Sequence, residues 1–324
     1  MEYRRLGNTG FRVSLLGLGG NTFGQHDSWK HYNDEAASIA IIDCALNLGV
    51  NHIDTADVYS MGVSETYVGK AIKGRRDKFF VASKVGMSTA DEPNCDGLSR
   101  GHIMAGVEDT LRRLNTDYID LYYAHQPDPL TPLEETLRAY DDLVQQGKVR
   151  YLGCSNFAGW QIAAAQSVAG FRGYAPYQVS QSPYNLFERD IESEIIPSCL
   201  NFGMKIVAYA PLAQGVLTGK YQRGKGVREN TRAYQNPSLN LSGDMSDEKL
   251  EMVEKLGNWS ADHGKTVGEL AIAWVAAQPS VCCVLTGVTS TAQLESNAQA
   301  TEWTLTSSQL QEINEITIDG RVGT

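Results

Sequence analysis

The sequence predicts a closed (β/α)8 barrel (a TIM barrel) that is preceded by a β-hairpin and carries a long loop after its seventh strand. Eight short apolar runs alternate with helical patterns along the chain, and this alternation is typical of parallel strands joined by crossover helices. Eight such units favour a closed barrel, although the alternation alone leaves an open, doubly wound sheet as an alternative. Neither a linker nor a low-complexity tract is evident, so residues 1–324 are interpreted as one domain.

The elements can be assigned in order along the chain. The hairpin consists of YRRL and FRVS on either side of the turn residues GNTG. The eight strands are expected at residues 14–20, 50–56, 78–84, 118–126, 149–156, 177–183, 204–211 and 280–287. The helices are expected at residues 34–49, 64–72, 99–114, 132–146, 160–168, 190–200, 247–263, 267–278 and 292–300. The helices at 247–263 and 267–278 both fall between the last two strands, so one of them is an extra helix.

Local signals mark some of the helix ends and the loops. Gly49 is expected to end the first helix as a C-cap, and Ser64, followed by glutamate, is expected to cap the second. Residues 86–98, after the third strand, and 212–243, after the seventh, are expected to form long loops. Loops of this length in a compact domain tend to be functional.

The composition argues against several classes of function. The net charge is −10 and the isoelectric point is near 5.1, the opposite of the balance usual in nucleic-acid binders. The chain lacks a run of about 18 apolar residues, and MEYRRLGNTG lacks the apolar core of a signal peptide, so we expect neither a membrane span nor secretion. The six cysteines show no CxxC spacing and are interpreted as reduced thiols of a cytoplasmic protein, with no metal site expected.

Three successive strand ends carry ionisable residues. Asp54 ends the second predicted strand and leads into Tyr59, Lys84 ends the third, and His125 ends the fourth. In a barrel, catalytic groups lie at the carboxyl ends of the strands. A buried lysine needs a partner, and Asp54 on the neighbouring strand could supply it.

This set of residues is suited to proton transfer. A free tyrosine has a pKa of about 10, and a nearby ammonium would lower it toward the range that acid–base catalysis needs. Asp54 would hold Lys84 charged and oriented, and His125 could donate a hydrogen bond to a substrate oxygen. Each residue alone is also compatible with a structural role, but together they favour protonation of a carbonyl oxygen by Tyr59. Asp57 is interpreted as a turn or loop carboxylate.

Several distinctive stretches resemble the aldo-keto reductases, across nearly the whole chain and most closely the branch of potassium-channel beta-subunit-like and bacterial members. They are LGLGGNTFG (16–24), GVNHIDTADVYSMGVSE (49–65), SKVG (83–86), LRRLNTDYIDLYYAHQPD (111–128), GKVRYLGCSNF (147–157), QSPYNL (181–186), YAPLAQGVLTGKY (209–221) and GVTSTAQLESN (287–297). The resemblance implies a catalytic tetrad of Asp54, Tyr59, Lys84 and His125, with a nicotinamide cofactor, usually NADPH, extended across the barrel mouth. It also implies an oxidoreductase that reduces an aldehyde or ketone to an alcohol, or runs the reverse reaction.

The resemblance also implies where that cofactor binds. The first glycine-rich stretch is not a GxGxxG motif, because its last position is a threonine, so a Rossmann site is not supported. The implied contacts with the nicotinamide, its ribose and the diphosphate are Gly20, Asn21, Thr22, Asp54, Ser155, Asn156, Gln181, Tyr209, Ala210, Leu212, Gln214, Gly215, Lys220 and Arg232. The implied contacts of the adenosine half are Gly287, Thr289, Gln293 and Asn297, the last three on one face of a helix.

One stretch departs from the family pattern. Many members carry lysine and arginine for the 2′-phosphate where this chain has Gly287, Val288 and Gln293, and Ser296 replaces a glutamate common in the branch that it resembles most. NADPH is the expected cofactor, with NADH left open. The substrate pocket is expected to include Trp29, Tyr59, Met87 and His125, with Tyr32 a further candidate. Neither the physiological substrate nor the oligomeric state can be predicted, although homo-oligomers occur in the resembling family.

Two other classes of function compete with this interpretation. Potassium-channel beta subunits share the fold and the helix stretch, and would make the protein a nicotinamide-binding regulatory subunit with weak reductase activity. The chain has His125 where those subunits carry asparagine, which favours the enzyme. A barrel glycosidase or lyase would need paired carboxylates at the strand ends, and only Asp54 qualifies clearly. The expected partners are therefore a small carbonyl or alcohol substrate and the cofactor, without nucleic acid or membrane.

Overall fold

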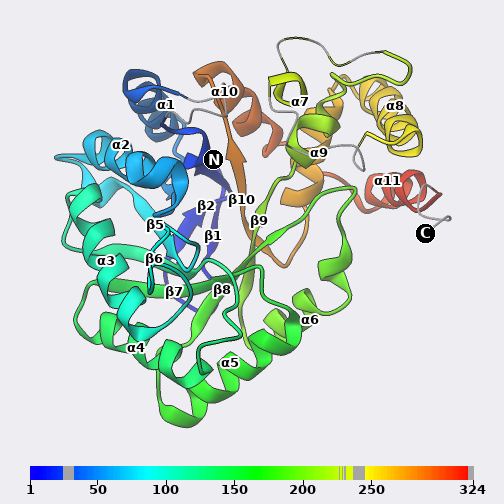
Figure 1. Cartoon of the computed structure of the whole chain (residues 1–324). Coiled ribbons are helices and arrows are strands. Elements are labelled where there is room, and N and C mark those ends of the chain that lie inside the picture. Colours follow the sequence, from blue (N-terminus) through cyan, green and yellow to red (C-terminus); the bar gives the residue numbers. More distant parts are fainter. Residues whose placement is uncertain (25–32, 226, 228, 230, 236–244, 320–324) are drawn as a thin grey trace.

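Eight parallel strands form a closed barrel (Figure 1). The computed structural model describes residues 1–24, 33–225, 227, 229, 231–235 and 245–319. The barrel strands are β3 (Leu16–Gly19), β4 (His52–Asp54), β5 (Phe80–Val85), β6 (Ile119–Ala124), β7 (Val149–Ser155), β8 (Tyr177–Pro183), β9 (Lys205–Tyr209) and β10 (Val281–Gly287). They are hydrogen-bonded in chain order, and β10 closes the ring by pairing with β3. The predicted (β/α)8 fold is therefore confirmed, and the open sheet is not.

The barrel interior is filled by side chains, because successive residues of a strand point to opposite faces of the sheet. Inward-facing apolar residues of the strands, Leu121, Val179 and Val207 among them, pack into one buried cluster. The outward-facing residues pack against the surrounding helices in a larger cluster. With the interior filled, the carboxyl ends of the strands are where catalytic groups are expected in such a barrel.

The hairpin predicted from the turn residues is present, and it closes the opposite end of the barrel. Strands β1 (Tyr3–Arg5) and β2 (Arg12–Ser14) pair antiparallel. Arg4 Nη1 donates to the carbonyl oxygen of Val281, 2.9 Å away, and the ring of Phe11 lies 4.8 Å from that of Phe80. Gly7 has a φ of 53°, and a Cβ there would lie 2.1 Å from the carbonyl oxygen of Gln178. Only glycine fits this close approach.

The helices surround the barrel much as expected (Figure 1). They are α1 (Glu35–Asn47), α2 (Val63–Ile72), α3 (Arg100–Leu114), α4 (Leu133–Gln145), α5 (Gly159–Arg172), α6 (Ile195–Asn201), α7 (Arg232–Gln235), α8 (Asp247–Asp262), α9 (Val267–Ala276), α10 (Thr291–Ala300) and α11 (Ser307–Asp319). Because α9 contacts β10 and α10 while α8 packs on α9 and α11, α8 is the extra helix. Within the described residues, no helix combines the length and apolar character needed to cross a membrane.

Four local expectations need correction. The N-cap of α2 is Gly62, at a φ of 86°, whereas Ser64 lies inside the helix and its hydroxyl donates to the carbonyl oxygen of Gly20. The predicted helix at 190–200 is a 3₁₀ turn (Asp190–Glu192) followed by the shorter α6. The helix α11 was not predicted, because its apolar positions are few. The loop after β9 contains a 3₁₀ segment (Ala213–Thr218) and α7 within its described part.

Candidate active site

A fully buried lysine occupies the carboxyl end of β5. Lys84 Nζ donates to Asp54 Oδ1, to the carbonyl oxygen of Thr55 at 2.8 Å and to the hydroxyl oxygen of Tyr59 at 3.3 Å. Burial disfavours the charged ammonium, but the charge of Asp54, the interaction with Tyr59 and the hydrogen bonds to both together outweigh it, and the pKa of Lys84 is raised. The lysine therefore remains an ammonium at neutral pH. Asp54 acts on the charge and orientation of Lys84, as the strand-end pattern suggests.

Tyr59 reaches this ammonium from a strained turn between β4 and α2. The residues after it, Ser60 and Met61, have φ angles of 48° and 53° and are followed by the left-handed Gly62. A non-glycine residue in the left-handed region of backbone angles costs about 1–3 kcal/mol of folding free energy, and it persists where the surrounding structure fixes it. One such restraint is the hydroxyl of Ser60, which donates to the carbonyl oxygen of Phe23.

The pKa of Tyr59 differs from the sequence-based expectation. Burial raises it, the ammonium of Lys84 lowers it, and Asp54 raises it, so that the net shift is upward. Lys84 does lower this pKa, as expected from the sequence, but the cost of burying a phenolate is larger. Tyr59 is thus a protonated phenol at neutral pH, which is the form that can donate a proton.

His125 faces Tyr59 from the end of β6. The two rings meet edge to face, with centroids 5.9 Å apart. Burial and the nearby Lys84 lower the pKa of His125 to about 3, so the imidazole is neutral and carries one N–H donor at neutral pH. Its backbone is fixed by a hydrogen bond from its N–H to the carbonyl oxygen of Val85, at 2.9 Å.

Three further hydrogen bonds connect strand ends at this edge of the barrel. Gln181 Nε2 donates to Asp54 Oδ2 at 2.8 Å, across the barrel from β8 to β4. Tyr209 at the end of β9 donates its hydroxyl to Asn156 Oδ1 at 2.8 Å, and Asn156 Nδ2 donates to the carbonyl oxygen of His125 at 3.0 Å. Three of the candidate cofactor residues, Gln181, Asn156 and Tyr209, are therefore connected to tetrad residues by hydrogen bonds.

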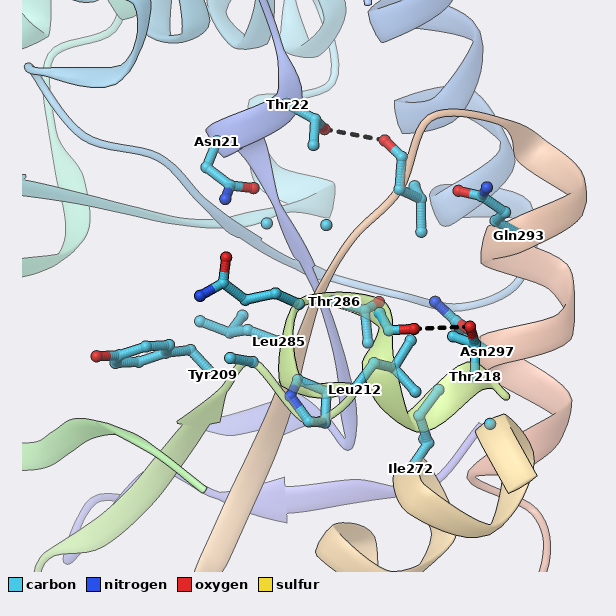
Figure 2. A pocket seen from close by; sticks show the side chains of 18 of the residues that line it. Asn21, Thr22, Tyr209, Leu212, Thr218, Ile272, Leu285, Thr286, Gln293 and Asn297 are labelled. Atoms are coloured by element: carbon cyan, nitrogen blue, oxygen red, sulfur yellow. Dashed lines mark hydrogen bonds between the residues drawn. The ribbon is translucent and has the colours of Figure 1, made fainter. Parts of the chain in front are cut away.

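A cavity of about 990 Å³ opens over these residues and extends to α10 (Figure 2). Tyr59, His125 and Asp54 line it, together with most of the residues expected to bind the cofactor: Asn21, Thr22, Ser155, Asn156, Gln181, Tyr209, Ala210, Leu212, Gln214, Gly215, Lys220, Gly287, Thr289, Gln293 and Asn297. Figure 2 shows Asn21 and Thr22 on one side of the space, and Gln293 and Asn297 approaching from α10.

Among the expected residues that the structure describes, Gly20 and Met87 do not line this cavity. Gly20 is buried behind it, and its neighbour Gly19 lines the wall instead. Met87 is exposed on the loop after β5. Trp29 and Tyr32 lie outside the described residues. Arg232 begins α7, but its side chain is outside the described set.

The end of the cavity next to α10 contains residues that were not among those expected to bind the cofactor. Thr218, Ser296 and Ala300 line it, as do Thr266, Gly268, Glu269 and Ile272 around the start of α9. The helix start was visible as a Thr-x-x-Glu capping box, and Thr266 and Glu269 do form one. The capping box predicts the start of a helix, but it does not predict that this helix end faces α10 across the cavity.

The start of α10 differs slightly from the expected arrangement. Gln293 and Asn297 lie on the helix, but Thr289 precedes its N-cap, Ser290. Thr289 nevertheless contacts Gln293, because its backbone N–H donates to Gln293 Oε1 at 2.9 Å. The three residues thus lie together through a side-chain contact, and not through helical spacing alone.

Asp57 is more than a turn residue. Its Oδ1 accepts from the backbone N–H of Val58 at 2.7 Å, as in a turn, but its Oδ2 is buried without a hydrogen-bond partner among the described residues. Burial and repulsion from Glu65 raise its pKa to about 7. A raised carboxyl pKa means that the folded state binds the proton more tightly, so ionisation of Asp57 destabilises the fold as the pH rises from about 4 to about 7.

Replacing Asp57 by asparagine is expected to stabilise the protein, and more at pH 8.5 than at pH 5. Asparagine keeps an acceptor for Val58 and removes the buried charge, for a gain of roughly 1–3 kcal/mol at pH 8.5. Urea unfolding at both pH values measures it. The control Asp120→Asn removes a buried carboxylate that is paired with Arg76 and Arg150 and should lose stability at both. An equal effect of Asp57→Asn at both pH values would contradict the ionisation argument.

Comparisons with known proteins agree with this geometry. The family model "Aldo/keto reductase family" matches residues 15–318. The chain is 37% identical to the aldo-keto reductase YhdN of Bacillus subtilis, covering 100% of this chain and 96% of that protein. It is 36% identical to a probable voltage-gated potassium channel subunit beta of Arabidopsis thaliana, covering 93% and 92%, and 31% identical to versiconal hemiacetal acetate reductase of Aspergillus parasiticus, covering 97% and 96%. With the barrel, the cavity and the Asp–Tyr–Lys–His arrangement already established, the matches lead to one conclusion: this chain belongs to the aldo/keto reductase family.

Proposed function

We propose that the protein is an NADPH-dependent oxidoreductase that interconverts an aldehyde or ketone and the corresponding alcohol, with Tyr59 as the proton donor. The observation that carries the proposal is the contact of Lys84 with both Asp54 and Tyr59, at the end of a cavity that His125 and Tyr59 line. A protonated phenol beside a buried ammonium is suited to giving a proton to a developing alkoxide. The relatives named as reductases support this reading.

The residues of the cavity fit a nicotinamide dinucleotide. The volume of the cavity, about 990 Å³, lies at the upper end of the usual range for ligand sites, about 300–1,000 Å³. Gln214 Oε1 and Thr286 Oγ1 are buried there without a hydrogen-bond partner among the described residues, and buried polar atoms normally have one. Ser155, Asn156 and Gln181 would hold the nicotinamide carboxamide, and Lys220 would hold phosphate oxygens.

The chemistry follows from the protein's own groups. When bound, the nicotinamide supplies the hydride that adds to the carbonyl carbon. Tyr59 donates its proton to the carbonyl oxygen, and Lys84 stabilises the phenolate that remains. The neutral His125 donates a hydrogen bond to the same oxygen and orients the carbonyl toward Tyr59. In the reverse direction the phenolate of Tyr59 accepts the alcohol proton.

A substrate screen tests the proposal directly. Purified protein is mixed with NADPH or NADH and a panel of aldehydes and ketones, or with the oxidised cofactors and alcohols, and absorbance at the nicotinamide band is followed. Turnover of at least one carbonyl with NADPH is expected. Binding of NADPH without turnover of any compound would reject the enzymatic proposal.

A second candidate function is favoured by the similarity to proteins named as probable voltage-gated potassium channel subunits beta. Under that reading, the protein is a nicotinamide-binding regulatory subunit, and its reductase activity is weak. The substrate screen separates the two, because a regulatory subunit would hold NADPH tightly and oxidise it slowly with every carbonyl offered.

Lys220→Met is expected to weaken NADPH binding by about 10-fold to 100-fold, because a hydrogen bond to a charged group contributes about 1.5–3 kcal/mol. Lys220 is a cation that lines the described part of the cavity. Fluorescence titration with NADPH and with NADH measures the two dissociation constants. Equal losses for both would assign Lys220 to the shared diphosphate, a larger loss for NADPH would assign it to the 2′-phosphate, and no loss for either would remove it from the site.

A further inference from the structure

A second charged cluster lies on the outer side of the barrel wall, behind Tyr59 and Lys84. Its centre is Glu65, which is fully buried on α2. Glu65 Oε1 accepts from the hydroxyl of Ser83 at 2.5 Å, and Oε2 accepts from Arg113 Nε, also at 2.5 Å. None of these three residues lines the cavity, so the chemistry described above leaves them without a role.

The cluster joins the two segments that carry the reacting pair. Glu65 lies six residues after Tyr59, and Ser83 immediately precedes Lys84 on β5. Because side chains alternate along a strand, Ser83 faces the helices while Lys84 faces the barrel interior. A single carboxylate therefore ties the segment of Tyr59 to the strand of Lys84, from the side opposite the reaction.

Arg113 supports the same turn from α3. A Cβ on Gly62 would lie 2.6 Å from Arg113 Cδ and 2.7 Å from its Nε, so the arginine side chain lies directly against the left-handed residue that ends the turn. Helices α2 and α3 pack side by side (Figure 1), which brings Arg113 to this position. Arg113, paired with Glu65, therefore lies against Gly62 at the end of the strained turn that follows Tyr59.

Burying the carboxylate of Glu65 costs desolvation free energy that an apolar side chain would not cost. Apolar residues of similar volume often stabilise a fold as well as a buried ion pair does, or better. What an apolar residue cannot do is fix two segments with directional hydrogen bonds. Such fixing matters here because Lys84 Nζ and the Tyr59 oxygen are 3.3 Å apart, close to the upper limit of a hydrogen bond.

We propose that Glu65 is a positioning residue for the proton transfer, which holds the Tyr59 hydroxyl within reach of Lys84 through its bonds to Ser83 and Arg113. The proposal rests on the proposed function of Tyr59 as proton donor. It deepens that function by assigning the alignment of the donor to a group outside the cavity.

Glu65→Gln and Ser83→Ala are the test variants. Glutamine keeps the shape of Glu65 but loses its charge, and alanine at 83 removes a single hydrogen bond, so the second variant stays informative if the first folds poorly. The kcat of carbonyl reduction is expected to fall about 10-fold to 100-fold in Glu65→Gln, the range produced by small misplacements of catalytic groups, and less in Ser83→Ala. The KM for the carbonyl and the dissociation constant of NADPH should stay unchanged.

The pH profile of kcat supplies a readout that a purely structural role would not move. Reduction needs Tyr59 protonated, so kcat falls as the pH rises through its pKa. Lys84 lowers that pKa, so a Tyr59 hydroxyl displaced from Lys84 has a higher one, and the alkaline limb should move to higher pH in both variants. An unmoved limb and a kcat equal to that of the unmodified protein would overturn the proposal.

Asp120→Asn is the matched control. Asp120 is also buried on these strands, accepts from the backbone N–H of Val81 at 2.9 Å and pairs with Arg76 and Arg150, but it lies at the opposite end of the barrel. The Asp120→Asn protein should lose thermal stability, while its kcat and the pH profile of kcat stay unchanged. The same kcat loss in Asp120→Asn would also overturn the proposal. Turnover in Tyr59→Phe, by contrast, would refute the proposed function itself, which keeps the two failures distinct.

Discussion

Tyr59→Phe is expected to abolish carbonyl reduction while leaving NADPH binding nearly intact. The substitution removes only the hydroxyl that contacts Lys84, and the loss of a positioned general acid typically lowers the rate by roughly 10²–10⁴-fold. The ring of Tyr59 stays to pack edge to face on His125. Stopped-flow measurement of NADPH oxidation at saturating carbonyl gives the rate, and fluorescence quenching gives the dissociation constant.

Tyr123→Phe is the control for that experiment. Tyr123 also faces the barrel interior near Lys84, with the ammonium 5.8 Å from its ring centre, but it does not line the cavity. Its variant should turn over at nearly the normal rate. Retained turnover in Tyr59→Phe, or an equal loss in Tyr123→Phe, would remove Tyr59 from the role of acid.

Lys84→Met is expected to lower both turnover and stability. Without the ammonium the phenolate of Tyr59 loses its stabilising charge, and electrostatic contributions of this kind are worth about 10²–10³-fold in kcat. The carboxylate of Asp54 would remain buried without its counterion, which costs about 3–5 kcal/mol. The alkaline limb of the remaining activity should also move to higher pH, since Lys84 lowers the pKa of Tyr59.

The double variant Lys84→Met with Asp54→Asn separates these two effects. Asparagine removes the unpaired charge and can still interact with Gln181, which donates to Asp54 across the barrel. Urea unfolding should show recovered stability, while kcat stays low. Recovery of turnover together with stability would mean that Lys84 acts only by supporting the fold.

Much of this site could be anticipated from sequence, because a parallel barrel brings every strand end to one edge. Asp54, Lys84 and His125 each follow an apolar run, and strand order alone makes β4, β5 and β6 neighbours. The order of strands and helices could likewise be predicted, because hydrophobic periodicity is a local property of the sequence. Neither inference needed knowledge of side-chain packing.

What could not be anticipated depends on packing between distant segments. Ser64 has the sequence signature of an N-cap, yet Gly62 takes that place and Ser64 instead bonds to Gly20. Glu65 was noted only as part of the cap, and its burial depends on α3 bringing Arg113 alongside. The net pKa shift of Tyr59 likewise depends on how deeply its ring is buried, which the pattern of residue types does not reveal.

Closure of the barrel has a consequence for how the chain is made. Strand β3 lies near the start of the sequence, yet one of its two neighbours, β10, spans residues 281–287. During synthesis, one edge of β3 therefore remains unpaired until nearly nine-tenths of the chain has left the ribosome. An unpaired strand edge invites association with other chains, and contacts this distant in sequence form slowly. Proteins cut short before β10 should therefore aggregate, and the nascent chain should depend on protection of that edge until the last strand arrives.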